Sequence, residues 1–162
     1  MPSAVLNANV SIGLAHGAVF SFLRHLFDSI YVPAAVVQEV VVQGHGRPGA
    51  AELQGALGIW ITEVTPSPQA VGAFSPPLRP PDAELLAVAV SRGADFVLSA
   101  DRVVRREAAQ RGLTCPTSAQ VVVLLKGGGH TQRVRPVLDQ MRAAGFGMAE
   151  LDYQQALTTA GE

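Results

Sequence analysis

Carboxylate and amide side chains stand among apolar neighbours at five positions of the 162-residue chain. These positions are Asn7, Glu39, Asp82, Glu84 and Asp101. Mg²⁺ and Mn²⁺ prefer hard oxygen ligands of this kind, with water molecules completing the coordination shell. A divalent ion held in this way activates water against a phosphodiester and stabilises the leaving oxygen. The five residues therefore indicate a site for metal-dependent hydrolysis.

Each of these residues also has a purely structural interpretation. Asp82 and Asp101 suit the first turn of a helix, where a carboxylate caps backbone N–H groups and meets the positive end of the helix dipole. Glu39 fits the solvent side of a helix, and Asn7 can close a turn through its own side chain. The residue types alone leave both interpretations open.

Strands and helices alternate along the predicted secondary structure. Short apolar runs predict strands at 4–7, 30–32, 59–64 and 94–98, with a further short step at 113–115. Apolar spacing and capping signals predict helices at 12–27, 34–42, 50–57, 82–92, 102–110, 117–126, 132–144 and 150–160. This order predicts an α/β fold with a mostly parallel central sheet of four or five strands and helices on both faces. Ligands of such sheets bind beyond the carboxyl ends of the strands, where Asn7 and Asp101 lie.

Prolines are concentrated in one part of the chain. Six of the 11 prolines fall between residues 66 and 81, which predicts a rigid, extended connection over the surface. We expect this connection to lie inside a single domain of residues 1–162, which closes with helices over 131–162.

The composition argues against several classes of protein. The single cysteine, Cys115, cannot form an internal disulfide, and a net charge of -1 argues against a strongly basic nucleic-acid binder. The longest apolar runs, such as 121–125, are much shorter than the ~20 residues that a membrane span needs. The first cationic residue is Arg24, so the apolar start lacks the charged region of a signal peptide. We therefore expect a cytoplasmic protein without a membrane segment.

Common active-site signatures are missing from the sequence. There is no Ser nucleophile elbow of the Gly-Xaa-Ser-Xaa-Gly type and no phosphate-binding loop that ends in Gly-Lys-Ser or Gly-Lys-Thr. Cys115 lies at a predicted strand end, where a lone cysteine is more often part of the core than a nucleophile. The four histidines share no metal-ligand spacing. The acidic and amide residues therefore remain the strongest candidates for chemistry.

Four short motifs, in order along the chain, resemble those of PIN-domain nucleases. They span residues 5–12, 32–40, 82–89 and 99–106. Residues 46–49 and 134–146 are in addition similar to one prokaryotic branch of PIN-like proteins, which is related to the VapC-type toxins of toxin–antitoxin pairs.

The resemblance implies a PIN-like three-layer fold and an endoribonuclease that uses Mg²⁺ or Mn²⁺ to cleave RNA. Asn7, Glu39 and Asp101 match three of the family's acidic positions, and Asp82 or Glu84 matches the remaining one. Asp82 and Glu84 lie about 200° apart on a helix, so we do not expect them to bind one ion equally. The resemblance also implies an antitoxin protein as a partner, and it leaves a homodimer open.

The chain departs from the family pattern at three positions. Asn7 stands where most members have Asp, and Pro81 and Ala100 replace a glycine and an acid. An amide oxygen still binds Mg²⁺, but the loss of one negative charge predicts weaker metal binding. One alternative is therefore a PIN-like module that binds RNA or a protein without cutting. Another is an unrelated α/β enzyme whose acids only cap helices.

Three arginines follow Asp101 at helical spacing. Arg102, Arg105 and Arg106 stand at i, i+3 and i+4, so we expect them to share one helix face and to bind RNA phosphates. The alternative is a solvated face that pairs with acids such as Glu107.

Overall fold

The computed structural model describes residues 2–74 and 78–162 and contains a sheet of four parallel strands. The strands are β1 (Ser3–Leu6), β2 (Ser29–Pro33), β3 (Ile61–Val64) and β4 (Phe96–Leu98), in the spatial order β3-β2-β1-β4. An isolated bridge between Phe96 and Thr114 extends the edge beside β4, where the sequence predicts a short step. The predicted α/β fold with a parallel sheet is confirmed.

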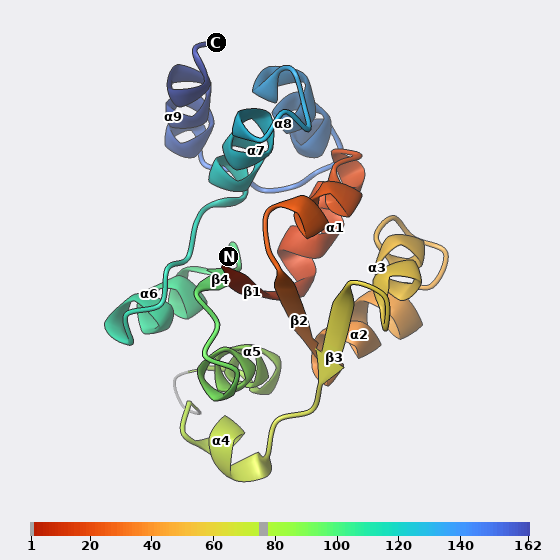
Figure 1. The fold of residues 1–162 in the computed structure, drawn as a ribbon, viewed down its shortest axis with the longest axis vertical. Coiled ribbons are helices and arrows are strands. Elements are labelled where there is room, and N and C mark those ends of the chain that lie inside the picture. The colour runs from red at the N-terminus through yellow and green to blue at the C-terminus, as the bar shows by residue number, and fades with distance from the viewer. Residues whose placement is uncertain (1, 75–77) are drawn as a thin grey trace.

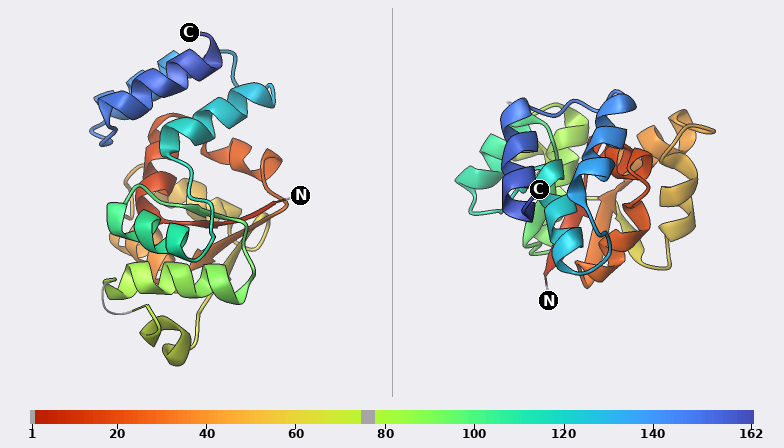
Figure 2. Two further views of the ribbon diagram at one scale, coloured as in Figure 1. Left: turned by 90° about the vertical axis from the view of Figure 1, so that its left-hand side faces the viewer. Right: turned by 90° about the horizontal axis from the view of Figure 1, so that it is seen from above.

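Helices cover both faces of the sheet (Figures 1 and 2). Alternate residues of a strand point to opposite faces, so each strand contributes side chains to the core on both sides. Ala4 and Leu6 belong to one hydrophobic cluster, and Val5, between them, belongs to the other. The larger cluster includes residues of α1 (Ala8–His16), the 3-10 helix η1 (Phe20–His25), α2 (Ala34–Val37), the π-helix η2 (Gln38–Gln43), α3 (Ala50–Ala56), α7 (Ser118–Gly127), α8 (Val134–Ala143) and α9 (Glu150–Ala160). The smaller cluster includes residues of α4 (Pro68–Gly72), α5 (Pro80–Ser91) and α6 (Arg102–Gln110).

The single helix predicted over 12–27 is wrong, because the chain breaks after His16. Ala18 adopts a left-handed φ of 59°, and the N–H groups of Ala18 and Val19 bond back to carbonyls of the last turn of α1. This Schellman arrangement usually has Gly at the left-handed position, whereas here the position holds Ala. The apolar periodicity continues through the break into η1 and therefore does not reveal it.

The sequence predicts an extended connection over the proline-rich stretch 66–81, but the structure has helical turns there. Pro68 begins the short helix α4, and Pro80 begins α5. Proline is favourable in a first helical turn, where its missing N–H would have no partner in any case. Pro76 and Pro77 lie outside the described residues.

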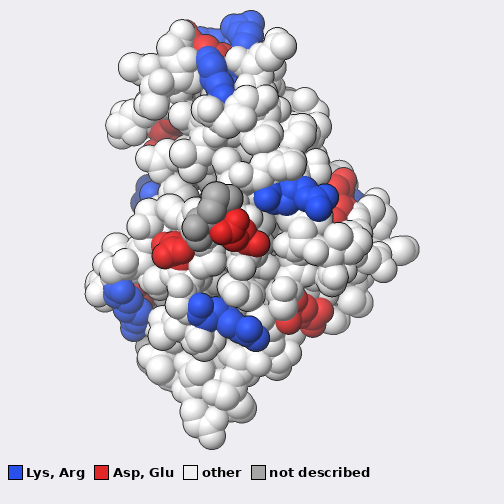
Figure 3. Space-filling view, viewed as in Figure 1, with Lys and Arg blue, Asp and Glu red and all other residues white. Residues whose placement is uncertain are grey.

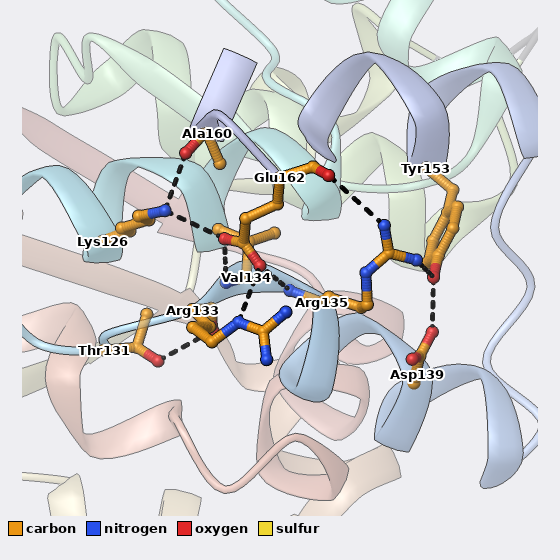
Figure 4. A network of polar contacts seen from close by, with 9 residues as sticks. All are labelled: Lys126, Thr131, Arg133, Val134, Arg135, Asp139, Tyr153, Ala160 and Glu162. Atoms are coloured by element: carbon orange, nitrogen blue, oxygen red, sulfur yellow. Dashed lines mark hydrogen bonds and ion pairs between the residues drawn. The ribbon is translucent and has the colours of Figure 1, made fainter. Parts of the chain in front are cut away.

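The carboxyl-terminal helices are joined through Glu162 (Figure 4). Its side chain is 7% exposed and accepts hydrogen bonds from the N–H groups of Val134 (2.7 Å) and Arg135 (3.1 Å) at the start of α8. It also pairs with Lys126 of α7 at 3.0 Å. Burial raises the pKa of Glu162, but these donors outweigh that effect and lower the pKa to about 2. The carboxylate therefore ties α7, α8 and the end of α9 together.

Charges are scattered over the face at which β1 begins, which Figure 3 shows in the orientation of Figure 1. Basic and acidic side chains alternate there without a continuous basic area. A nucleic-acid backbone is bound mainly through Lys and Arg side chains, so this face has no cationic track for it. In the part of the chain that the structure describes, no helix is both long enough and apolar enough to cross a membrane.

Candidate active site at the carboxyl ends of the strands

A cavity of about 520 Å³ lies where the parallel strands end. Its wall includes Asn7 directly after β1, Glu39 in η2, Asp82 in α5 and Asp101 after β4. These residues are far apart in sequence. The parallel order of the strands brings them together, because the carboxyl ends of parallel strands meet at one edge of a sheet.

Asn7 is held at the end of β1 by hydrogen bonds at both ends of its amide. Oδ1 accepts from the N–H of Ala8 (2.8 Å), and Nδ2 donates to Oγ of Ser99 (3.0 Å). The residue is only 6% exposed. Asn7 therefore joins β1 to the end of β4 and contributes an uncharged amide to the cavity wall.

Asp101 caps the amino terminus of α6. Its Oδ1 accepts from the N–H groups of both Val103 (2.9 Å) and Val104 (3.0 Å). The interpretation of Asp101 as a helix cap is therefore correct. Both of these bonds use Oδ1, however, so Oδ2 is not needed for capping and a second role is compatible with the geometry.

Glu39 lies in a π-helix, whereas the sequence predicts one α-helix over 34–42. The α-helical part ends at Val37, and η2 continues to Gln43. A π-helical turn closes on residue i+5 instead of i+4, and Gln38 and Gln43, five residues apart, both line the cavity beside Glu39. Single π-helical turns are frequent at functional sites. Glu39 is exposed, so its carboxylate keeps contact with water.

Asp82 lies in the cavity wall, and Glu84 does not. Asp82 is 6% exposed in the first turn of α5, where the helix dipole favours a carboxylate. Glu84 is half-buried farther along the same helix. Arg79, whose side chain is 79% exposed, pairs with Asp82 at 3.4 Å and places a cation at the mouth of the cavity.

The sequence interpretation omits four polar residues of this wall, namely Asn9, Gln38, Gln43 and Arg79. Oδ1 of Asn9 accepts from the N–H of Ala100 (3.3 Å) and so fixes the turn that leads into Asp101. Signals in the sequence point to two of the four. Asn9 follows Asn7 by two residues, and Arg79 precedes Asp82 by three, which is the spacing of a helical ion pair.

Two of the three arginines after Asp101 line the same cavity. Arg102 and Arg105 line a second cavity, next to the acidic one. Arg106 is exposed and lines neither of these two cavities. The shared RNA-binding face of the three arginines stays a prediction.

Two further residues of this region have structural partners. Glu107 is buried and pairs with Arg111 at 2.7 Å. It is therefore not the solvent-exposed partner of the three arginines that the sequence left open. Cys115 donates to the carbonyl of Ser99 at 3.6 Å. Burial raises the pKa of the Cys115 thiol despite this bond and the nearby Arg105, so the thiol stays protonated at neutral pH.

The donor set of the acidic cavity fits a divalent ion that keeps much of its water. Three carboxylates and four amide side chains line the cavity. Among the described residues, however, no three acidic, His or Cys side chains converge closely enough to form a metal cluster by themselves. Mg²⁺ is usually held by one or two carboxylates and retains several waters. Each water occupies roughly 30 Å³ in the liquid, so the cavity has room for a hydrated ion.

A family model described as PIN domain matches residues 3–162 of the chain. The chain belongs to the PIN-domain family. No curated protein matches it significantly. The matched region includes all four motifs that resemble PIN-domain nucleases, and the predicted family is confirmed.

Membership of the PIN-domain family removes one of the alternatives considered from the sequence. PIN domains are in general nucleases and typically bind a divalent metal. An unrelated α/β enzyme whose acids only cap helices is therefore excluded. In this PIN domain, the cavity formed by Asn7, Glu39, Asp82 and Asp101 lies inside the matched residues, at the edge of the sheet where ligands of parallel sheets bind.

Proposed function

We propose that this PIN-domain protein is an endoribonuclease that uses Mg²⁺ or Mn²⁺ and that the acidic cavity is its active site. The observation that supports the proposal is the convergence of Asn7, Glu39, Asp82 and Asp101, from four separate segments, on one cavity. Hydrolysis of a phosphodiester needs hard oxygen ligands with room for water and for a phosphate oxygen, and this wall offers both.

Each residue has its own part in the proposed site. Oδ2 of Asp101 and the carboxylate of Asp82 would hold the ion, and the exposed Glu39 would orient water in its shell. A bound ion would supply Lewis acidity that activates water and stabilises the leaving oxygen. Asn7 would contribute an amide oxygen while its Nδ2 holds Ser99. Glu84, outside the cavity wall, has no part in this arrangement.

The ion is expected to bind weakly. With an effective dielectric constant near 20, one unit charge at ~4 Å contributes up to ~4 kcal/mol before hydration offsets it. Asn7 lacks that charge, and Arg79 competes for Asp82. Millimolar Mg²⁺ or the more readily bound Mn²⁺ is therefore the appropriate condition for an activity assay.

The partners follow from the same proposal. RNA is the substrate, and Arg102, Arg105 and Arg106 would bind its phosphates. The resemblance of residues 46–49 and 134–146 to VapC-related proteins supports the toxin of a toxin–antitoxin pair, whose antitoxin would cover the acidic cavity. A homodimer is a further proposal that size-exclusion chromatography with light scattering would test.

Two observations favour a second candidate function, a PIN-like module that binds RNA or a protein without cutting. Both polar ends of Asn7 are engaged in hydrogen bonds, and among the described residues no three acidic side chains form a closed cluster. In that case RNA would bind but would not be hydrolysed.

The experiment that separates these functions is cleavage of a panel of fluorescent single-stranded RNAs with Mg²⁺, with Mn²⁺ and with EDTA. The wild type and Asp101→Asn are compared, because Asn retains the helix cap and removes the charge. Cleavage that requires both the metal and Asp101 supports the nuclease. Binding without cleavage in every metal supports the second candidate.

A further inference from the structure

A second cavity of about 520 Å³ lies beside the acidic one, on the other side of the turn between β4 and α6. The turn supplies Asp101 to the acidic cavity and Ala100 to the second one. The walls of the second cavity come from the start of α6, the start of α7, the connection between α8 and α9 and the first turn of α9. An RNA strand that crosses the acidic cavity would therefore continue into the second cavity.

Two buried polar atoms in this wall have no hydrogen-bond partner. They are Oγ of Ser118, a residue that is 5% exposed, and Nε of Arg105. Both residues line the cavity. A buried polar atom without a partner costs free energy, and such groups in folded proteins usually meet a ligand or a water. Here both atoms can donate a hydrogen bond, so the missing ligand is an acceptor.

The surroundings of these atoms favour an anion. Ser118 is the first residue of α7, a helix of ten residues, and the helix dipole places partial positive charge there. The hydroxyl of the N-cap Thr117 accepts a hydrogen bond from the N–H of Gln120. The N–H groups of Ser118 and Ala119, in the first turn of α7, have no intrahelical acceptor. Arg102 adds a full positive charge to the same wall.

The rest of the lining is mostly apolar and comes from the connection between α8 and α9 and from the first turn of α9. It contains Phe146, Met148 and Leu151, and Leu151 is 66% exposed. Apolar and aromatic side chains contact nucleic-acid bases with little sequence preference. Asp152 also lines this cavity and adds one negative charge to it.

We infer that the second cavity binds one nucleotide of single-stranded RNA next to the nucleotide at the acidic cavity. Its phosphate accepts from Arg105, Ser118 and the amino terminus of α7, and its base lies against Met148 and Leu151. This inference rests on the proposed function, since it takes RNA as the ligand. It goes beyond that function because it assigns a subsite for a second nucleotide and the residues that bind its phosphate and its base.

The test is binding of a fluorescein-labelled single-stranded RNA of about ten nucleotides, followed by anisotropy in EDTA over a series of salt concentrations. The variants are Ser118→Ala and Arg105→Gln. The control is Arg92→Gln, which removes the same charge from the far end of α5, where Arg92 packs over Tyr31. Melting temperatures are measured for all of them.

Arg105→Gln is expected to weaken RNA binding about tenfold and to reduce the salt dependence by about one phosphate contact. Ser118→Ala is expected to weaken binding about threefold to tenfold. Its melting temperature should stay unchanged or rise, because the hydroxyl has no partner to lose. A merely structural role would change the melting temperature and leave RNA affinity alone. Arg92→Gln should change affinity less than about twofold.

The apolar wall is tested with the same RNA carrying a single abasic unit at each position in turn. One position should weaken wild-type binding, and Leu151→Ser should remove the difference at that position. Unchanged affinity in both Ser118→Ala and Arg105→Gln would overturn the subsite, whether or not the protein cleaves RNA. Loss of affinity in these variants without any cleavage would instead overturn the nuclease and leave the subsite standing.

Discussion

Nδ2 of Asn7 donates a hydrogen bond to Oγ of Ser99 over 3.0 Å, and this contact joins the end of β1 to the end of β4. The same hydroxyl oxygen accepts from the N–H of Asp101 at 3.2 Å. Ser99 is fully buried, so the bridge is shielded from competing water. It therefore fixes the two strand-end residues of the acidic cavity relative to one another.

Asn7→Asp is expected to strengthen Mn²⁺ binding by about tenfold or more, because it adds a charge to the cavity. The fold should tolerate the change, since the hydroxyl of Ser99 can donate to a carboxylate as well as accept from an amide. Isothermal titration calorimetry with Mn²⁺ measures the effect, and Gln110→Glu, which adds the same charge at the far end of α6, is the control. Equal Mn²⁺ affinity in the wild type and Asn7→Asp would place Asn7 outside the metal site.

Arg79→Gln should leave the free energy of unfolding within about 1 kcal/mol of the wild type, because the Arg79 side chain is 79% exposed and its pair with Asp82 is long, at 3.4 Å. The freed carboxylate of Asp82 should bind Mn²⁺ about twofold to fivefold more tightly. Arg79→Lys keeps the charge and serves as the control in the same titration. If removal of the cation weakened Mn²⁺ binding, Arg79 would belong to the ligand set and not compete with it.

Two substitutions of Asp101 separate its capping role from its charge. Asp101→Ala removes both bonds to Val103 and Val104 and should cost about 0.5–2 kcal/mol of stability. Asp101→Asn keeps a good helix cap and should cost much less. Urea unfolding followed by circular dichroism gives both values. RNA cleavage, in contrast, should be lost equally in the two variants, and cleavage that survived in Asp101→Asn would argue against a metal ligand at this position.

The site residues read from the sequence are those that follow directly from local patterns. Asp101 comes after an apolar run and before a helical one, so its place at a strand end and a helix start can be predicted from neighbouring residues alone. Ser99 depends on a contact between segments far apart in the sequence, which no local pattern specifies. The spacing of Arg79 and Asp82 indicates an ion pair, but its place at the cavity depends on how α5 packs in the fold.

The errors in the predicted elements have a similar origin. Ala18 adopts a conformation that glycine usually supplies, so the end of α1 carries no typical stop signal. The widening of the helix at Gln38 leaves the apolar periodicity almost unchanged, so a π-helix looks like an α-helix in the sequence. The choice between Asp82 and Glu84 depends on how α5 packs on the sheet, because this packing determines which of the two side chains lines the cavity.

Glu162→Gln is expected to lower the free energy of unfolding at pH 7 by about 1–3 kcal/mol, since it weakens the bonds to Val134, Arg135 and Lys126. The pKa of Glu162 is lowered from 4.5 to about 2 in the folded protein. Its stabilising effect is therefore fully present above the unfolded-state pKa and is lost as the pH falls through the folded-state pKa.

Urea unfolding at pH 7 and at pH 3 checks this dependence. The difference between wild type and Glu162→Gln should shrink at the lower pH. Glu150→Gln is the control, because Glu150 is 62% exposed in its pair with Arg142 and should contribute little to stability. A difference that stays constant with pH would show that the charge of Glu162 does not hold the carboxyl-terminal helices together.

The most direct test of the proposed active site is an anomalous difference map from crystals of the protein grown with Mn²⁺. The account predicts one peak inside the acidic cavity, bound by Asp101 and Asp82 and completed by water, and its absence in Asp101→Asn. A Mn²⁺ peak at another place on the protein, or an empty cavity in crystals whose protein still cleaves RNA with Mn²⁺, would contradict it.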